Sequence, residues 1–388
     1  MRQGQSSGQN WDVSSWACYL IHTALQQKGW LATQGCLSLM TMVQLLLRVA
    51  VERRSFHAIA SRLHQLPGAE TLRLLLHRWL PATTAQLQPV ITATLGQKLP
   101  KALSRRERTM AIDIHTRPYY GDKDTPGTWR SQPKASTKTF FAYATLLVIR
   151  KGMSFTVGIV PVVKGNDMPA IIDQLLAQAL VMNLKPRRLL LDRGFYSAEV
   201  MLHLQQKQLP YVMPMIQRGK KGKTKATSTA TRQFFIKRRR GWDRYTWKAR
   251  VRKTGKQAGK RTSVTTEVCM APRPGEVPLV FACHGLKHMP PAELARIYRR
   301  RFRIETSYRQ MNEGLAMTCS KNAVYRLLLV LIGCLLRNLW LWLNRLAHKR
   351  GGTTSIRHRD FLMLLSRCLD RRLGVLWKML VPTRCPAT

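Results

Sequence analysis

Apolar and polar positions in the first hundred residues follow the spacing of helices, and strand-like alternation is almost absent. The pattern predicts an apolar helix over 37–51, a second helix that Ser55 caps and that ends near Leu66, and a third over 69–79 after the Pro67–Gly68 turn. Two short helices across such a turn resemble a helix-turn-helix, although an ordinary helical bundle with solvated basic residues explains the pattern equally well. We expect residues 1–105 to form a helical N-terminal region, with DNA contact as its expected role.

From about residue 106, runs of β-branched and aromatic residues replace the helical spacing. Strands are predicted over 108–114, 139–150, 154–163, 188–192 and 211–215, and helices over 168–182 and 197–206. This order, three strands followed by helix, strand, helix and strand, is that of a ribonuclease-H-like domain. The fold class predicted for residues 106–216 is therefore α/β, with a mixed sheet.

A Lys- and Arg-rich stretch with β character follows over residues 217–284. Its strand-like runs are 234–236, 245–247, 264–270 and 279–283, and its most basic parts, expected to be exposed, are Lys220–Lys225 and Arg252–Arg261. We interpret this stretch as a β-rich insertion set into the domain before its last helices. Pro290 and Pro291 begin the next helix, because proline suits a first turn. Residues 285–348 then complete the domain, and 349–388 form a basic helical tail.

The charge of the chain narrows the choice of partner. Sixty-five Lys and Arg residues against nineteen Asp and Glu residues give a formal net charge of +46. A field of this sign favours a polyanionic partner and salt-sensitive association, and nucleic acid is the obvious candidate. A ribosome-associated or membrane-surface protein would show the same charge, so composition alone leaves these alternatives open.

Cysteine usage and hydropathy bear on localisation. The eight cysteines show no Cys-x-x-Cys pair and no regular framework, which favours free thiols in a reducing cytoplasm and argues against a zinc site. The N-terminus lacks the apolar core of a signal peptide. Residues 327–343 approach the length of a membrane span, but Arg337 and Asn338 lie inside the stretch, and a buried amphipathic helix is the preferred interpretation. We expect a cytoplasmic, nucleoid-associated protein with no membrane partner.

Three carboxylates stand out because acidic residues are so few. Asp113 lies within the apolar run Ala111–Ile114, and Asp192 ends the run Leu189–Leu191. Glu305 falls on one helical stripe with Tyr298 and Arg301, at positions i, i+3 and i+7. A buried carboxylate must be paired or must coordinate a cation. If the three meet, Mg²⁺ or Mn²⁺ would relieve their repulsion, and two ions about 3.5–4 Å apart would support phosphoryl transfer on nucleic acid.

Simpler roles remain open for each of these carboxylates. Asp113 could cap a turn or pair with His115 or Arg117. Asp192 could be a helix N-cap or form a salt bridge to Arg193. Glu305 could pair with Arg301 or Arg309 on a helix surface, a contact of little energetic value.

The pattern resembles the transposases of bacterial insertion sequences, the Asp-Asp-Glu enzymes of the integrase superfamily. The similarity is greatest to the branch with the signature Y-x2-R-x3-E-x6-K and a β insertion before the glutamate. Tyr298, Arg301 and Glu305 match its first three positions, whereas Asn312 stands where the branch has lysine. Arg309 could supply the missing phosphate contact. The resemblance spans roughly residues 105–345.

This resemblance implies roles for particular residues. Asp113, Asp192 and Glu305 would hold two Mg²⁺ or Mn²⁺ ions, and Tyr298 and Arg301 would contact phosphate near the cut. Relatives use a tryptophan of the insertion to hold a flipped base, for which Trp242 and Trp247 are candidates. Ordinary packing within the β insertion is the alternative role for each of them. 

The implied reaction is cleavage of double-stranded DNA at terminal inverted repeats, followed by strand transfer into target DNA, by an enzyme that acts as a homodimer. A nuclease or resolvase of the same fold that never joins strands is the nearest alternative. A catalytically inactive DNA-binding relic is another, and Asn312 favours it.

Overall fold

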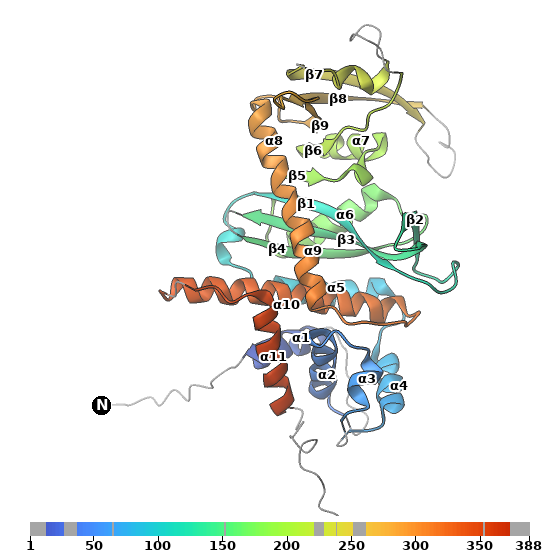
Figure 1. The fold of residues 1–388 in the computed structure, drawn as a ribbon, viewed down its shortest axis with the longest axis vertical. Helices are drawn as coiled ribbons and strands as arrows, with labels where there is room; N and C mark the ends of the chain where they lie inside the picture. The colour runs from blue at the N-terminus through green and yellow to red at the C-terminus, as the bar shows by residue number, and fades with distance from the viewer. Residues whose placement is uncertain are drawn as a thin grey trace, which may run out of the picture. The chain divides into compact units, whose positions relative to one another are not determined.

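The computed structural model describes residues 13–26, 37–63, 66–150, 153–220, 229–237, 239–250, 261–351 and 354–372. The chain divides into two compact units, which Figure 1 draws with their helices and strands labelled. Leu99–Tyr308 form the first, called the sheet unit below, and Met1–Lys98 with Arg309–Thr388 form the second, called the helical unit.

In the described part of the sheet unit, nine strands form one mixed sheet in the order β2-β3-β1-β5-β6-β9-β8-β7, with β4 also paired to β3. The strands are β1 (Arg108–Pro118), β2 (Trp129–Lys134), β3 (Thr137–Arg150), β4 (Met153–Val162), β5 (Pro186–Leu191), β6 (Tyr211–Pro214), β7 (Gly241–Arg250), β8 (Arg261–Ala271) and β9 (Leu279–His284). Strand β3 is long enough for β2 and β4 to pair with different parts of it. The central pairs β1–β5 and β5–β6 are parallel. This is the mixed α/β sheet that the sequence predicted.

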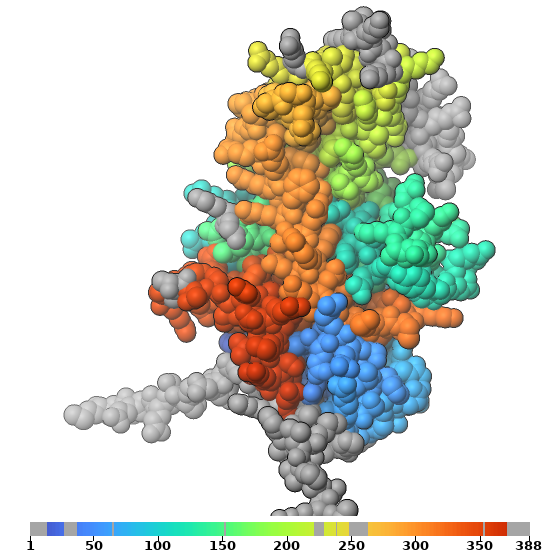
Figure 2. Space-filling view, in the orientation of Figure 1, coloured from blue at the N-terminus to red at the C-terminus, as the bar shows by residue number. Residues whose placement is uncertain are grey.

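Helices follow the strands in the predicted order. Helix α6 (Met168–Val181) packs on β3 and β4, and α7 (Ala198–Gln206) contacts α6 and β8. Helix α8 (Pro291–Arg299) packs on β8. A short 3₁₀ turn, η4 (Arg300–Phe302), joins α8 to α9 (Arg303–Glu313). Figure 2 shows this segment as a continuous band in orange, so its outer side lies on the surface.

The β-rich insertion extends the sheet of the domain that contains it. Strand β9 pairs antiparallel with β6, β8 pairs with β9, and β7 pairs with β8. Its first strand-like run, 234–236, was wrongly predicted, because residues 230–234 form the 3₁₀ helix η3 (Ala230–Phe234). The basic residues 221–225 and 252–260 lie outside the described residues.

The helical unit contains α1 (Val13–Gln26), α2 (Leu39–Val51), α3 (Phe56–Ala60), α4 (Ala69–Trp79), α5 (Thr84–Gly96), α10 (Ala323–Lys349) and α11 (His358–Arg372) among its described residues. Ser55 caps α3 as predicted, since its hydroxyl accepts a hydrogen bond from the Ala58 N–H. That helix ends at Ala60, earlier than the expected Leu66. The helix-turn-helix interpretation of α3 and α4 stays a prediction.

Helix α10 is the apolar stretch that approaches the length of a membrane span. It is long and apolar enough to cross a membrane, yet 72% of its most apolar window is buried inside the protein. It packs on α5 and α2, and Arg337 and Asn338 are themselves buried in this helix. The burial agrees with a core helix.

The compact units divide the chain differently from the five predicted segments. Residues 285–348 were predicted to complete the catalytic domain, whereas Arg309 and all that follows belong to the helical unit. The boundary between the two units falls within α9, so this helix contributes to both. The functional roles assigned to the five segments stay predictions.

Candidate active site

The register between β1 and β5 brings the two predicted aspartates side by side. Ala111 is paired with Leu190 in this parallel ladder, and both are fully buried in the core beneath α8. Side chains alternate between the faces of a strand, so residues two positions further on point the same way. Those residues are Asp113 and Asp192, each one residue beyond the last pair of this ladder, Ile112 with Leu191. The sheet therefore presents two carboxylates on the face that α8 covers.

Arg301 joins these aspartates to Glu305. Its Nη1 atom lies 3.3 Å from Oδ2 of Asp113, and its Nη2 atom lies 3.0 Å from Oε1 of Glu305 and 3.8 Å from Oδ1 of Asp192. The Arg301 side chain is 7% exposed, whereas those of Asp113, Asp192 and Glu305 are 15%, 40% and 55% exposed. All three predicted carboxylates thus converge on one buried guanidinium group.

Tyr298 anchors the helix that carries Arg301. Its buried hydroxyl donates a hydrogen bond to the Leu191 carbonyl at 3.1 Å, next to Asp192, and its ring packs against Phe281. Burial raises the pKa of Tyr298, so the hydroxyl remains a donor. In this structure Tyr298 positions Arg301 and does not lie open to solvent; the phosphate contact that the resemblance implies for Tyr298 and Arg301 stays a prediction.

Tyr308 is a second positioning residue, which sequence analysis missed. Its hydroxyl donates to the backbone carbonyl of Asp113 at 2.9 Å and lies 2.7 Å from the Thr145 hydroxyl. Its ring lies tilted beside the His115 ring, with 4.7 Å between centroids. A signal existed, because Tyr308 lies seven residues after Arg301 and three after Glu305, spacings that share one helical face. Tyr298 and Tyr308 fasten the helix to the sheet on either side of Arg301.

The electrostatics of the site centre on Asp113. Burial, and the nearby charges of Asp192 and Glu305, raise the pKa of Asp113 to about 6, against the opposing effects of Arg301 and of the Ile114 N–H that donates to its carboxylate. Burial by itself would lower the pKa of Arg301, but Tyr298 and the three carboxylates outweigh it and raise this pKa. The site holds more negative charge than Arg301 balances.

The donor set fits a hard divalent cation. Carboxylate oxygens are the ligands that Mg²⁺ and Mn²⁺ prefer. Among the described residues, no group of three or more His, Cys, Asp or Glu side chains is gathered as a ready metal site. The Arg301 guanidinium lies between the carboxylates instead and supplies the positive charge that such a cluster requires. The residues therefore fit a metal in type and charge, provided that the side chains rearrange around it.

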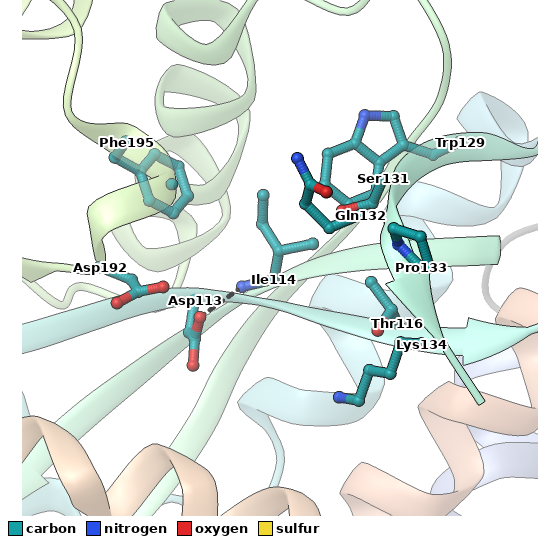
Figure 3. A pocket seen from close by; sticks show the side chains of 11 residues that line it. Asp113, Ile114, Thr116, Trp129, Ser131, Gln132, Pro133, Lys134, Asp192 and Phe195 are labelled. Atoms are coloured by element: carbon teal, nitrogen blue, oxygen red, sulfur yellow. Dashed lines mark hydrogen bonds between the residues drawn. The ribbon is translucent and has the colours of Figure 1, made fainter. Parts of the chain in front are cut away.

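A cavity of about 380 Å³ adjoins the two aspartates. Figure 3 shows Asp113 and Asp192 on one side of it and residues of β2, including Trp129 and Lys134, on the other. The sequence pattern indicates no strand at these residues, and β2 is thus an addition to the expected site.

The two candidate tryptophans of the insertion lie elsewhere. The Trp242 indole donates its N–H to the Met289 carbonyl at 2.9 Å, and the ring packs on the core beneath α8. Trp247 lies near the rings of Tyr196 and Tyr245, with centroids 4.8 and 6.1 Å away. Neither residue lines the cavity, and a base-holding role for either stays a prediction.

Arg309 and Asn312 also lie on α9, beyond the sheet unit. Arg309 is exposed and is the first residue of this segment of the helical unit, and Asn312 follows it. The phosphate contact that Arg309 could supply in place of the missing lysine stays a prediction.

Comparison with known proteins settles the family. Residues 104–339, more than half of the chain, match the family model described as "Transposase DDE domain". The chain belongs to this transposase family. The matched region covers the strands and helices that carry Asp113, Asp192 and Glu305, and the predicted family is thus confirmed.

The fold of the transposase is similar to one solved by cryo-EM. The known structure is the "piggyBac transposase synaptic complex with hairpin DNA"; the similarity covers 98% of this chain and 87% of that chain, with a TM-score of 0.57 and 11% sequence identity. At this identity the likeness shows the fold. No curated protein matches the sequence.

Proposed function

We propose that this transposase cuts DNA at the ends of a mobile element and joins the freed 3′ ends to target DNA. Asp113, Asp192 and Glu305 would hold the divalent cations for both steps. The observation that carries the proposal is the convergence of these carboxylates on Arg301, just past the parallel-paired segment of β1 and β5 and beside an open cavity. Side chains at this edge of a sheet are well placed to meet a ligand.

One or two Mg²⁺ or Mn²⁺ ions, when bound, would activate the attacking oxygen and stabilise the leaving oxygen of a phosphodiester. The chain's own contribution is to hold the ligands in place. Asp113 is fixed on both sides, by the Ile114 N–H at its carboxylate and by Tyr308 at its carbonyl. Glu305 is the most exposed of the three and has the most freedom to rearrange around a cation. Arg301 holds the three carboxylates together in this structure, and bound cations would take over that charge.

DNA is the expected partner. The net charge of +46 supports it, because phosphate contacts from Lys and Arg release counterions and supply affinity without sequence preference. The family implies a homodimer that holds two element ends. Because the ends themselves are unknown, the inverted repeats that flank the reading frame are the substrate to test.

A cleavage and joining assay tests the proposal. A labelled duplex carrying the flanking repeat is incubated with Mn²⁺ and a supercoiled acceptor plasmid, and both cut and joined products are measured. Joined product is expected from the wild type, and Asp192→Asn should remove both products while DNA binding persists. Asp173→Asn is the matched control, because Asp173 lies on α6 and pairs with His203 and Lys207.

Other outcomes would redirect the assignment. Cut product without joined product would mean a nuclease of the same fold. Binding without either product in the wild type would mean an inactive relic. An unchanged cleavage rate in Asp192→Asn would rule out the proposed site.

A further inference from the structure

The connection between β1 and β3 is a folded part of the sheet unit. The Tyr119 and Thr125 hydroxyls lie 3.1 Å apart, and the Thr128 hydroxyl donates to the Thr125 carbonyl at 2.8 Å; all three residues are buried. The Lys164 N–H donates to the Thr128 carbonyl and ties the connection to the segment just after β4, which ends at Val162. A side chain at Gly121 would bring a Cβ within 2.3 Å of the Tyr119 hydroxyl. The connection therefore holds β2 in a defined position.

Strand β2 bulges away from its partner. Trp129 and Arg130 pair with Phe140 and Thr139, but the next pair joins Lys134 to Thr137, so the register shifts between Arg130 and Lys134. A bulge releases residues from the ladder and redirects their side chains, and bulges are common next to active sites. The residues released here, 131–133, end in a proline, which cannot donate to a ladder.

The bulge forms the wall of the cavity that faces the aspartates. Trp129, Ser131, Gln132 and Lys134 line that side, and Asp113, Asp192 and Phe195 line the other (Figure 3). Its volume of about 380 Å³ lies near the lower end of the range for small-ligand pockets, about 300–1,000 Å³. A single nucleotide fits such a space.

The chemistry of the two walls matches the parts of a nucleotide. The aspartate side is anionic and would face a phosphate only through cations. The Lys134 ammonium group on the opposite side suits the next phosphate along the strand, and Ser131 and Gln132 offer neutral hydrogen-bonding groups. The partly buried Trp129 indole provides a flat apolar surface, on which any base can stack.

We propose that this cavity is a subsite for one unpaired nucleotide next to the phosphate that is cut. Trp129 stacks on its base, and Lys134 contacts its phosphate. The inference rests on the proposed function, since it takes the carboxylates as the site of cleavage. It assigns the stacking role to a tryptophan of β2, whereas the indole N–H of Trp242 is already bound to Met289 within the sheet unit.

A binding assay without metal tests the subsite separately from catalysis. Fluorescence anisotropy compares two labelled duplexes in EDTA, one fully paired and one with a single unpaired nucleotide at the end of the flanking repeat. The wild type should prefer the unpaired end, and Trp129→Ala should remove that preference by about ten-fold, within the range measured for lost base stacking. Trp129→Phe, which keeps an aromatic surface, should retain most of the preference.

Two lysine variants, one inside the cavity and one outside it, supply the matched control. Lys134→Gln removes the lysine that lines the cavity, and Lys138→Gln removes an exposed lysine on the neighbouring strand that does not line it. Only Lys134→Gln should weaken binding of the unpaired end several-fold. The subsite would be overturned if the two lysine variants weakened binding equally. It would also be overturned if Trp129→Ala, with an unchanged melting temperature, preferred the unpaired end as strongly as the wild type. Where Trp129→Ala fails to fold, the lysine pair decides.

Failure of the subsite and failure of the proposed function give different results. A wild type that prefers unpaired ends through Trp129 and Lys134 but never cuts DNA would refute the proposed function and keep the nucleotide subsite. A wild type that cuts and joins DNA, with no preference for an unpaired end, would refute the subsite and keep the function.

Discussion

Replacement of Asp113 by asparagine should stabilise the protein in the absence of metal. Asparagine has nearly the shape of aspartic acid and carries no charge, so it mimics the protonated form. The pKa of Asp113 rises from its ordinary value of 3.8 to about 6 in the folded chain, with burial as the main cause and the charges of Asp192 and Glu305 adding to it. The folded site therefore disfavours the charged carboxylate, even with Arg301 beside it.

The size of this stabilisation and its pH dependence follow from the shift in the pKa of Asp113. A tenfold change in an ionisation constant corresponds to about 1.4 kcal/mol, so the change from 3.8 to about 6 destabilises the folded protein by about 3 kcal/mol at pH 8. Because the folded pKa is the higher one, the wild type is relatively most stable below pH 4 and loses this stability as the pH rises through about 6. The advantage of Asp113→Asn should be full at pH 8 and absent near pH 3.5.

Urea unfolding in EDTA measures the difference in free energy of unfolding between the wild type and Asp113→Asn. Asp173→Asn is the control for loss of a carboxylate from a helix surface. Addition of Mn²⁺ at pH 8 should reverse the order, because the wild type gains a ligand that binds only the folded state and the variant loses it. Equal stability of wild type and Asp113→Asn at pH 8 in EDTA, or an advantage of the variant that persists at pH 3.5, would refute the reasoning.

Three further outcomes are expected. Tyr308→Phe should lower the free energy of unfolding by about 1–2 kcal/mol, because the hydroxyl that contacts the Asp113 carbonyl and Thr145 is lost, and should slow cleavage in the same assay that tests Asp192. Arg48→Met should lower the free energy of unfolding, measured in urea, by about 2 kcal/mol, because the buried Arg48 guanidinium pairs with Glu52 and Asp370. Arg54→Met should lower it by less than about 1 kcal/mol, because the exposed Arg54 side chain lies 3.9 Å from Glu52. Affinity for DNA should fall by about 10³-fold or more between 50 and 200 mM salt if six or more phosphates are contacted, and a shallow salt dependence would argue against a wide phosphate-binding surface.

The sequence could predict the strands and the acidic residues because their signals are local. Apolar runs identified β1 and β5, and alternation along each strand then put Asp113 and Asp192 on one face. Helical spacing likewise aligned Arg301 with Glu305, although a 3₁₀ turn interrupts the helix that sequence analysis took as continuous.

Other features depend on contacts that spacing does not record. Strand β2 is short, polar and largely exposed, contains Pro133 and pairs at the sheet edge, so it lacks the apolar alternation of a strand. Helical spacing fixes the face on which Arg301 lies, but the three-way contact of its guanidinium depends on how far α8 and η4 carry it over the sheet. The run at 234–236 has strand-like residues, yet η3 buries Phe234 in a 3₁₀ turn, with its ring edge-on to Tyr245.

The pairing of β9 with β6 makes the insertion inseparable from the enzyme core. Only four residues of β6 lie between β5 and β9, so hydrogen bonds run without interruption from the aspartate-bearing strands to β7. Excision of residues 217–284 would strip one side of β6 and leave a bare strand edge, a template for aggregation. We therefore expect shortened variants of this transposase to tolerate deletions between β8 and β9 better than loss of the strands themselves.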